Sequence, residues 1–191
     1  VKLITYSMQN LYSIAISPPD EVISSVKNMK ESLNKAVGWF NSKNSLAHIT
    51  INEFKSSELQ LENIKKQLTY ICNGFEPIKV RMNSFGSYNN GAFYIAPDAC
   101  SKMGLKAIMK HLNNSLCISE KKTSNDPHMS VARRLSPEAL GKAKALFDKV
   151  DLNFTCDHVV IRRFNPDIKQ FEIIDRIPFN NKPDYTQGTL F

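Results

Sequence analysis

Residues 46–54 of this chain read LAHITINEF, and residues 127–133 read PHMSVAR. Both stretches alternate apolar and polar residues with a period of two, which is typical of a strand with one buried face. Each holds a histidine followed two positions later by a hydroxyl residue, HIT at residues 48–50 and HMS at residues 128–130. Residues i and i+2 of a strand share a face, so each triplet points an imidazole and a hydroxyl to the same side.

The two triplets begin units with the same predicted order of elements, a strand, a helix and two strands, over residues 47–96 and 127–179. This repetition indicates an internal duplication. Apolar spacing and breaker residues predict strands at 11–17, 46–54, 77–85, 92–96, 127–133, 154–164 and 170–179, helices at 20–33, 57–72, 100–117 and 136–150, and a loop at 119–126. We therefore expect an α+β fold, bilobal and pseudo-twofold, with two antiparallel-rich sheets, outer helices and a central cleft.

His48 and Thr50 occupy the same positions in the first unit as His128 and Ser130 in the second. Facing strands from the two units would hold two imidazoles and two hydroxyls around one space. Such a cluster suits an oxyanion with a leaving group on one side and a nucleophile on the other. The alternative is two unrelated structural histidines, because short motifs also arise by chance. Their equivalent positions in a duplicated unit favour the catalytic pair.

These motifs, in this context, resemble those of the two-histidine (2H) phosphoesterase superfamily, in particular its 2′-5′ RNA ligase-like, RNA 2′,3′-cyclic phosphodiesterase group. The resemblance extends from LYSIAISPPDEV at residues 11–22 to the final strand pair, and it includes Arg133, five residues after His128. Ser130 stands where threonine is common in the group. The resemblance implies a bilobal α+β domain and a metal-independent enzyme that opens 2′,3′-cyclic phosphates on RNA or a nucleotide, with reversible 2′-5′ RNA ligase activity left open.

By the same resemblance, His48 is the general acid and His128 the general base, although a near-symmetric site can run in either direction. Histidine titrates near neutral pH without help, so we expect no cofactor and no metal. Thr50 and Ser130 are expected to hydrogen-bond the nonbridging phosphate oxygens. Arg133 is a candidate phosphate clamp. It lies an odd number of residues from His128, however, and a flat strand would turn it away, so the alternative is a surface charge.

Two further groups of residues leave their roles open. Arg162 and Arg163 are adjacent in a strand, so alternation directs one of them to each face, and the sequence does not say which faces the cleft. The middle hairpin carries four aromatic residues that could stack on a nucleobase or pack in the core, Phe85, Tyr88, Phe93 and Tyr94. We expect at least two of the four to be core residues.

The charge of the chain favours a polyanionic partner. Lys and Arg number 25 against 18 Asp and Glu, which gives a formal net charge of +7 and a pI near 9.2. Two other functions therefore stay open beside a phosphodiesterase for RNA or a nucleotide bearing a cyclic phosphate. One is an RNA-binding module without turnover, and the other is a phosphodiesterase for a small nucleotide-derived cyclic phosphate such as that of ADP-ribose.

Length, hydropathy and cysteine usage set the remaining expectations. The 191 residues fit one domain, 1–191, built from two similar lobes, whose residues 1–10 we expect to be flexible or foreign to it. No apolar run approaches the ~18 residues of a membrane span, so we expect no membrane association.

Four cysteines without a CxxC pair, Cys72, Cys100, Cys117 and Cys156, indicate reduced, mostly buried thiols and a cytoplasmic protein. We expect a monomer.

Overall fold

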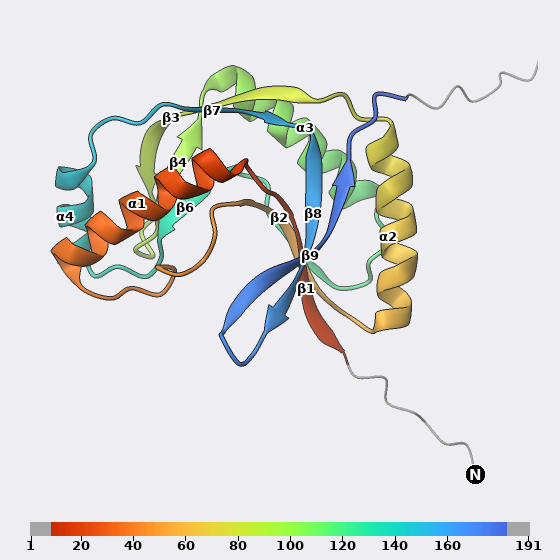
Figure 1. The fold of residues 1–191 in the computed structure, drawn as a ribbon, viewed down its shortest axis with the longest axis horizontal. Helices are drawn as coiled ribbons and strands as arrows, with labels where there is room; N and C mark the ends of the chain where they lie inside the picture. The colour runs from red at the N-terminus through yellow and green to blue at the C-terminus, as the bar shows by residue number, and fades with distance from the viewer. Residues whose placement is uncertain (1–8, 183–191) are drawn as a thin grey trace, which may run out of the picture.

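The computed structural model of this chain describes residues 9–182 (Figure 1). Its elements, in chain order, are β1 (Asn10–Ile16), α1 (Asp20–Val37), β2 (Ile49–Ser56), α2 (Glu58–Asn73), β3 (Ile78–Ser87), β4 (Phe93–Pro97), α3 (Ala99–Ser115), β5 (Lys121–Thr123), β6 (Met129–Ala132), α4 (Pro137–Leu146), β7 (Leu152–Cys156), β8 (His158–Asn165) and β9 (Gln170–Pro178). Residues 1–8 of the stretch that we predicted to be flexible or foreign lie outside the described residues. Asn10, which that prediction included, is the first residue of β1 and pairs with Ser56.

Antiparallel pairing links the strands in the order β7-β3-β4-β6-β2-β1-β8-β9, and β5 pairs with β2 beside this path. The strands β2 and β6 are joined by one residue pair, Ile49 with Met129. We call β2, β1, β8 and β9 the His48 lobe, and β6, β4, β3 and β7 the His128 lobe. The predicted α+β class with two lobes is confirmed, and the two predicted sheets are joined into one at this pair.

The two lobes repeat the same strand register on either side of the junction. Thr50 of β2 pairs with Ala15 of β1, and Ser130 of β6 pairs with Tyr94 of β4. The residue before each hydroxyl forms the joining pair, so the two H-x-[ST] motifs lie beside one another across the junction. This matching register supports the duplication predicted from the sequence.

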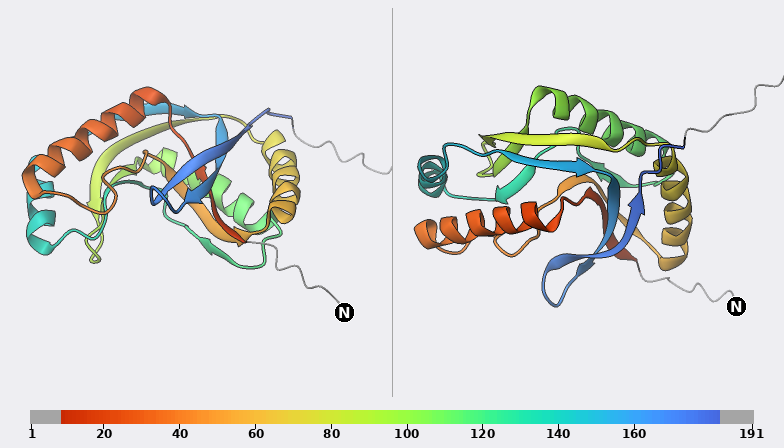
Figure 2. Two further views of the ribbon diagram at one scale, coloured as in Figure 1. Left: turned by 60° about the horizontal axis from the view of Figure 1, so that its bottom comes forward. Right: turned by 45° about the horizontal axis from the view of Figure 1, so that its top comes forward.

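The helices cover the sheet in two groups. Helix α1 packs against α4 and against β6 and β7 of the His128 lobe, although it connects two strands of the His48 lobe. Helix α2 lies against β9, and α3 lies against β2, β3 and β4. Figures 1 and 2 show α1 and α4 at one end of the molecule and α2 at the opposite end. The crossing of α1 therefore ties the two lobes together.

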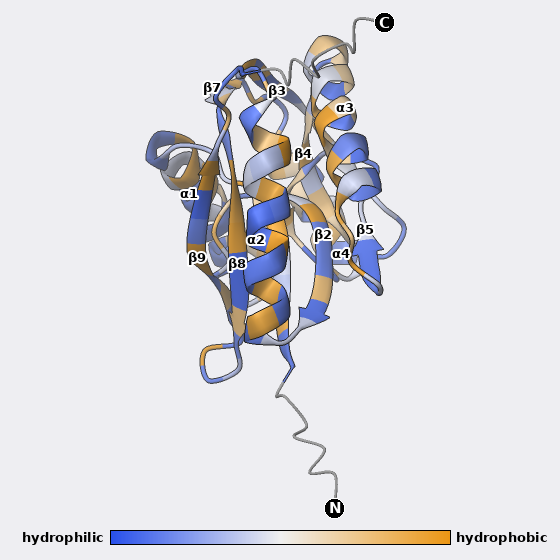
Figure 3. Cartoon of the chain, turned by 90° about the vertical axis from the view of Figure 1, so that its right-hand side faces the viewer, coloured by the Kyte–Doolittle hydropathy of each residue, from blue (hydrophilic) through white to orange (hydrophobic). Residues whose placement is uncertain are grey.

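Local sequence explains where these helices begin and which face they bury. Ser57 caps α2 in a capping box with Gln60, and Ser136 caps α4 with Pro137 in its first turn. The buried residues of α2 recur every three or four positions, at Leu61, Ile64, Leu68 and Cys72. In Figure 3, hydrophobic and hydrophilic residues alternate along and around α2.

The structure corrects the prediction of a single strand at 154–164. This stretch belongs to two strands with Asp157 between them, and the two strands lie in different lobes, β7 beside β3 and β8 beside β1. Apolar residues continue through the junction, so the sequence pattern does not reveal that the chain crosses between lobes. A second correction is β5, which forms inside the predicted loop 119–126.

The cysteines are divided between the core and the surface. Cys72 and Cys156 are buried, whereas Cys100 and Cys117 are exposed, so the expectation of mostly buried thiols holds for half of them. All four are free thiols. Within residues 9–182, no helix has the length and apolar character needed to cross a membrane.

Candidate functional site

The two motif histidines are held by the same backbone contact. The Nδ1 of His48 lies 2.6 Å from the carbonyl oxygen of Leu46, and the Nδ1 of His128 lies 2.8 Å from the carbonyl oxygen of Asp126. A carbonyl oxygen can only accept, so Nδ1 carries the proton in each contact. In the neutral ring Nε2 is then the unprotonated nitrogen, and both imidazoles present the same atom for proton transfer.

A bulge in each motif strand decides which later residues share the face of the hydroxyls. In β2, Thr50 pairs with Ala15 and Asn52 pairs with Ile14, so Ile51 is an extra residue. Val131 is the extra residue of β6 in the same way, since Ser130 and Ala132 pair with consecutive residues of β4. A bulge shifts the alternation by one position. Residues an odd number of places from the histidines, at 53 and 133, can therefore return to the histidine face.

The motif residues meet at a cleft made of two adjoining cavities. The first, which we call the His48 cavity, has a volume of about 210 Å³ and contains His48 in its wall. The second, the His128 cavity, has a volume of about 550 Å³ and is lined by His128 and by both motif hydroxyls. Glu53 and Arg133 line both cavities. The structure thus brings together all five residues that the sequence singled out.

Arg133 reaches the cleft because the strand bends as well as bulges. β6 ends at Ala132, and Arg134 has a φ of 55°, a left-handed conformation that turns the chain directly after Arg133. The expectation that a flat strand would turn Arg133 away from His128 therefore does not apply. Glu53 stands at the matching position of the other motif and was missed by the sequence analysis.

His48 lies among positive charges. Burial lowers its pKa well below the usual 6.5, and the cations Arg162, Arg133 and Lys30 lower it further, against the opposing effect of the Leu46 carbonyl. Arg162 is only 6% exposed and lines the His48 cavity. Burial lowers the pKa of its guanidinium to about 10, although nearby Glu53 acts in the opposite direction.

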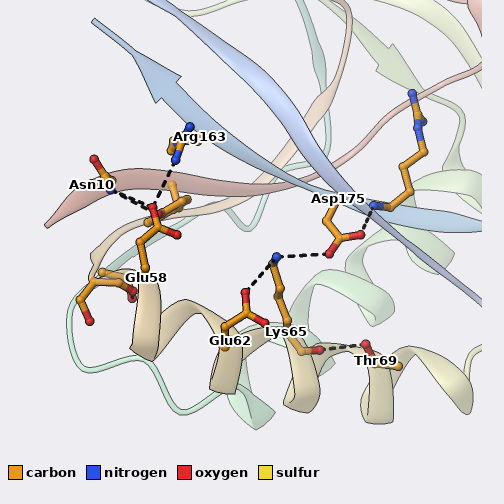
Figure 4. Close-up of polar contacts among 11 residues, drawn as sticks. Asn10, Glu58, Glu62, Lys65, Thr69, Arg163 and Asp175 are labelled. Carbon is orange, nitrogen blue, oxygen red and sulfur yellow. Dashed lines mark hydrogen bonds and ion pairs between the residues drawn. The ribbon is translucent and has the colours of Figure 1, made fainter.

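The structure decides which of the two adjacent arginines faces the cleft. Arg162 donates from Nη2 to the hydroxyl of Ser13 at 2.8 Å, on the cavity side of β8. Arg163 points to the other side, where its Nη1 lies 3.2 Å from Oε1 of Glu58. Figure 4 shows that pair beside Asn10, with the ion pairs of Lys65 further along α2.

Lys30 is a second residue that the sequence analysis missed. It is 1% exposed, and its ammonium donates to the carbonyl oxygens of Ser42 at 3.0 Å and Ser45 at 2.6 Å and to the Ser45 hydroxyl at 3.1 Å. Burial lowers its pKa to about 8. These bonds hold the loop directly before Leu46, whose carbonyl orients His48. A lysine at an apolar position of the α1 stripe, between Val26 and Leu33, is the signal that could have found it.

His128 has two aromatic neighbours. Tyr88 lies edge-on at 5.6 Å between ring centroids, and Tyr94 lies at 5.0 Å. The Tyr88 hydroxyl donates to the carboxylate of Asp126, which also pairs with Lys102 at 2.9 Å. Burial raises the pKa of this carboxyl, but the two hydrogen bonds outweigh burial and keep it below its usual value.

The remaining hairpin aromatics pack in the core, as expected for at least two of the four. Phe85 and Phe93 stack on each other at 5.2 Å, and Phe147 packs against both. Tyr94 can reach His128 because it covers Gly86, where a Cβ atom would come within 2.5 Å of the ring.

Within residues 9–182, no three His, Cys, Asp or Glu side chains lie close enough together to hold a metal ion.

Comparison with protein-family models gives a family for this chain, and comparison with solved structures gives its fold. A family model described as the 2′-5′ RNA ligase superfamily matches residues 18–167. Among solved structures, TT0787 of Thermus thermophilus has a TM-score of 0.61 at 16% identity and covers 90% of this chain and 99% of its own. Escherichia coli LigT in its apo form has a TM-score of 0.62 at 12% identity and covers 89% of this chain and 97% of its own.

A third solved structure, Kluyveromyces marxianus Usb1, has a TM-score of 0.56 at 11% identity and covers 88% of this chain and 98% of its own. Structures of LigT also include complexes with phosphate and with 3′-AMP. At such identities the likeness establishes the fold alone. A search of curated protein sequences finds no match.

Proposed function

Because this chain belongs to the 2′-5′ RNA ligase superfamily, we propose that it is a phosphodiesterase that opens 2′,3′-cyclic phosphates, on an RNA end or a nucleotide, without a metal. The observation that carries the proposal is the pairing of Ile49 with Met129. That pair sets the two H-x-[ST] motifs side by side at one cleft, with the Nδ1 of each imidazole on a backbone carbonyl. The solved complexes of LigT with phosphate and 3′-AMP are consistent with such a ligand.

Two imidazoles at one phosphorus can share the proton transfers of this reaction. The base takes a proton from water as the new P–O bond forms, and the acid gives a proton to the ribose 3′-oxygen as its bond to phosphorus breaks. The product is a 2′-phosphate with a free 3′-hydroxyl. We assign the acid role to His48 and the base role to His128, as the sequence resemblance implies.

The charge around His48 adds a step to this assignment. Its lowered pKa makes the ring neutral in the ligand-free protein at pH 7, whereas a general acid must carry a proton. A bound phosphate anion would oppose the charges of Arg133 and Arg162 and so raise the pKa of His48. His48 would therefore take up its proton together with the substrate.

The other residues of the cleft would bind and stabilise the phosphate. The hydroxyls of Thr50 and Ser130 can donate to nonbridging oxygens as charge builds on them. Arg133, at the junction of the two cavities, can donate two parallel hydrogen bonds to the same group. With the 5′-hydroxyl of a second RNA in place of water, the same steps would form a 2′-5′ bond.

The test uses an RNA that ends in a 2′,3′-cyclic phosphate, with EDTA present. We expect His48→Ala and His128→Ala each to lower turnover by more than ~100-fold, the scale of a lost general acid or base. His111→Ala, which removes an exposed histidine of α3 packed on Phe75, is the matched control and should turn over normally. Unchanged rates in both cleft variants would rule out the proposal.

The net charge of +7 is also compatible with two other functions. An RNA-binding module without turnover predicts salt-dependent RNA affinity that persists in the double histidine variant, with no cleaved product. A phosphodiesterase for a small cyclic phosphate predicts turnover of free nucleotides or of an ADP-ribose cyclic phosphate, and little turnover of RNA. The substrate comparison separates both from the first proposal.

We also propose that the protein acts as a monomer in the cytoplasm. The four free thiols support a reducing compartment. Light scattering of the purified protein tests the monomer, and a dimer at micromolar concentration would contradict it.

A further inference from the structure

The two lobes have the same strand register, but they carry different side chains beside their histidines. Next to Ser130 the paired residue is Tyr94, whose ring covers Gly86 and packs on His128. The residue at the matching place beside Thr50 is Ala15, which has no ring to offer. Val160, which pairs with Ala15 as Gly86 pairs with Tyr94, lines the His48 cavity. Matching backbone positions therefore carry different side chains, so that a ring packs on His128 and the matching position beside Thr50 has no ring.

The wall of that cavity on the β8–β9 side is aromatic. Phe164 and Phe171 face each other across the hairpin with ring centroids 5.4 Å apart and planes at 65°. Both side chains are only partly buried, and both line the cavity, together with Ile173. Partly exposed aromatic rings in a cavity are the surfaces on which nucleobases stack.

Polar groups complete the cavity. The amides of Asn41 and Gln170 line it from opposite segments of the chain and can both donate and accept hydrogen bonds. Arg162 lies over the ring of Phe171, with its guanidinium carbon 5.1 Å from the centroid. Its buried Nε has no hydrogen-bond partner among the described residues. A charged donor left without a partner beside an aromatic wall indicates a ligand with acceptor atoms on a flat ring.

We propose that the His48 cavity is the nucleobase subsite, in which the base of the cyclic nucleotide stacks on Phe171 and Phe164 and turns its acceptor edge toward Arg162. This inference rests on the proposed function, because it places the substrate's base relative to its phosphate. The ribose then lies on the His48 side of the phosphorus. Its departing oxygen is nearest to His48, which agrees with the acid role given to that residue.

The test measures binding without turnover, by calorimetry and by the NMR signals of the aromatic rings. The probes are a nucleoside 2′-monophosphate and inorganic phosphate, which share the phosphate but not the base. We expect the nucleotide to bind more tightly than phosphate, and Phe171→Leu to weaken the nucleotide by about 5- to 150-fold, the range for one lost base–aromatic stack. Phosphate affinity should stay as it is in the wild type.

Phe75→Leu is the matched control, since Phe75 is a partly buried phenylalanine that packs on His111 and Phe179, outside both cavities of the cleft. It should leave both affinities unchanged. If Phe171→Leu fails to fold, Phe164→Leu repeats the measurement from the other ring. Equal affinity of the wild type for nucleotide and phosphate would overturn the proposal, and so would ring shifts at Tyr88 in place of Phe171.

The outcome separates this inference from the proposed function. If the nucleotide binds as expected but no cyclic phosphate is opened, the subsite stands and the proposed reaction is wrong. If the cyclic phosphate is opened and Phe171→Leu turns it over with an unchanged KM, the reaction stands and the subsite is wrong.

Discussion

The His48 and His128 halves of the cleft use one backbone arrangement with two different sets of side chains. In both, the histidine precedes a short strand, its Nδ1 contacts the carbonyl two residues earlier, and a bulge follows the hydroxyl. Arg162, Arg133 and Lys30 act on His48, however, whereas two tyrosine rings pack on His128 and the Asp126 carboxylate lies near it. The matching backbone therefore holds both imidazoles in the same way, and the side chains beside each imidazole differ.

The largest expected effect tests what the two halves have in common. Thr50→Val and Ser130→Ala should each lower kcat by about 100- to 1,000-fold, because each removes one donor to the developing oxyanion. Thr69→Val is the control, since its hydroxyl donates only to the Lys65 carbonyl on exposed α2. Steady-state kinetics on a cyclic phosphate provide the measurement. A variant that keeps the wild-type kcat would exclude its hydroxyl from the site.

An intermediate effect tests the cationic half. Arg133→Met should lower kcat/KM by about 10- to 150-fold, the range for a lost charged hydrogen bond. The same change removes a positive charge near His48, so the pKa of His48 should rise toward 6.5 in an NMR titration. Arg163→Met, which removes an arginine paired with Glu58, should change neither value. A His48 pKa that does not move in Arg133→Met would contradict this account of the charge.

The smallest effect on turnover is expected from Lys30→Met, because Lys30 lines neither cavity, holds the loop that carries the Leu46 carbonyl and is the weakest of the three cations that act on His48. Its effect on stability should depend on pH. Lys30 loses its proton near pH 8 in the folded protein and near 10.5 when unfolded, so the unfolded chain binds more protons between these values.

The unfolding free energy of the wild type should therefore rise relative to Lys30→Met by up to about 3 kcal/mol from pH 8 to 10.5. Urea unfolding of both proteins at pH 7.5 and pH 10 gives the difference, in which the titrations of all other groups cancel. A pH-independent difference would show that Lys30 keeps its ordinary pKa in the folded protein.

The sequence predicted most of the fold because its strands and helices have clear periods. It missed the division of residues 154–164 into β7 and β8, since alternation within a strand is local and the change of lobe is not. It also missed β5, whose three residues are too short and too polar to show a pattern. Both elements exist because a partner strand from another part of the chain is beside them.

The sequence by itself determined the two H-x-[ST] motifs, their strands and the common face of each imidazole and hydroxyl. Tertiary structure alone decided the rest. Bulges returned Arg133 and Glu53 to the cleft, the pairing of β8 with β1 turned Arg162 inward, and helix packing buried Lys30 beneath the loop before His48. The physical reason is that strand period depends on neighbouring residues, whereas register, bulges and burial depend on contacts between residues far apart in the chain.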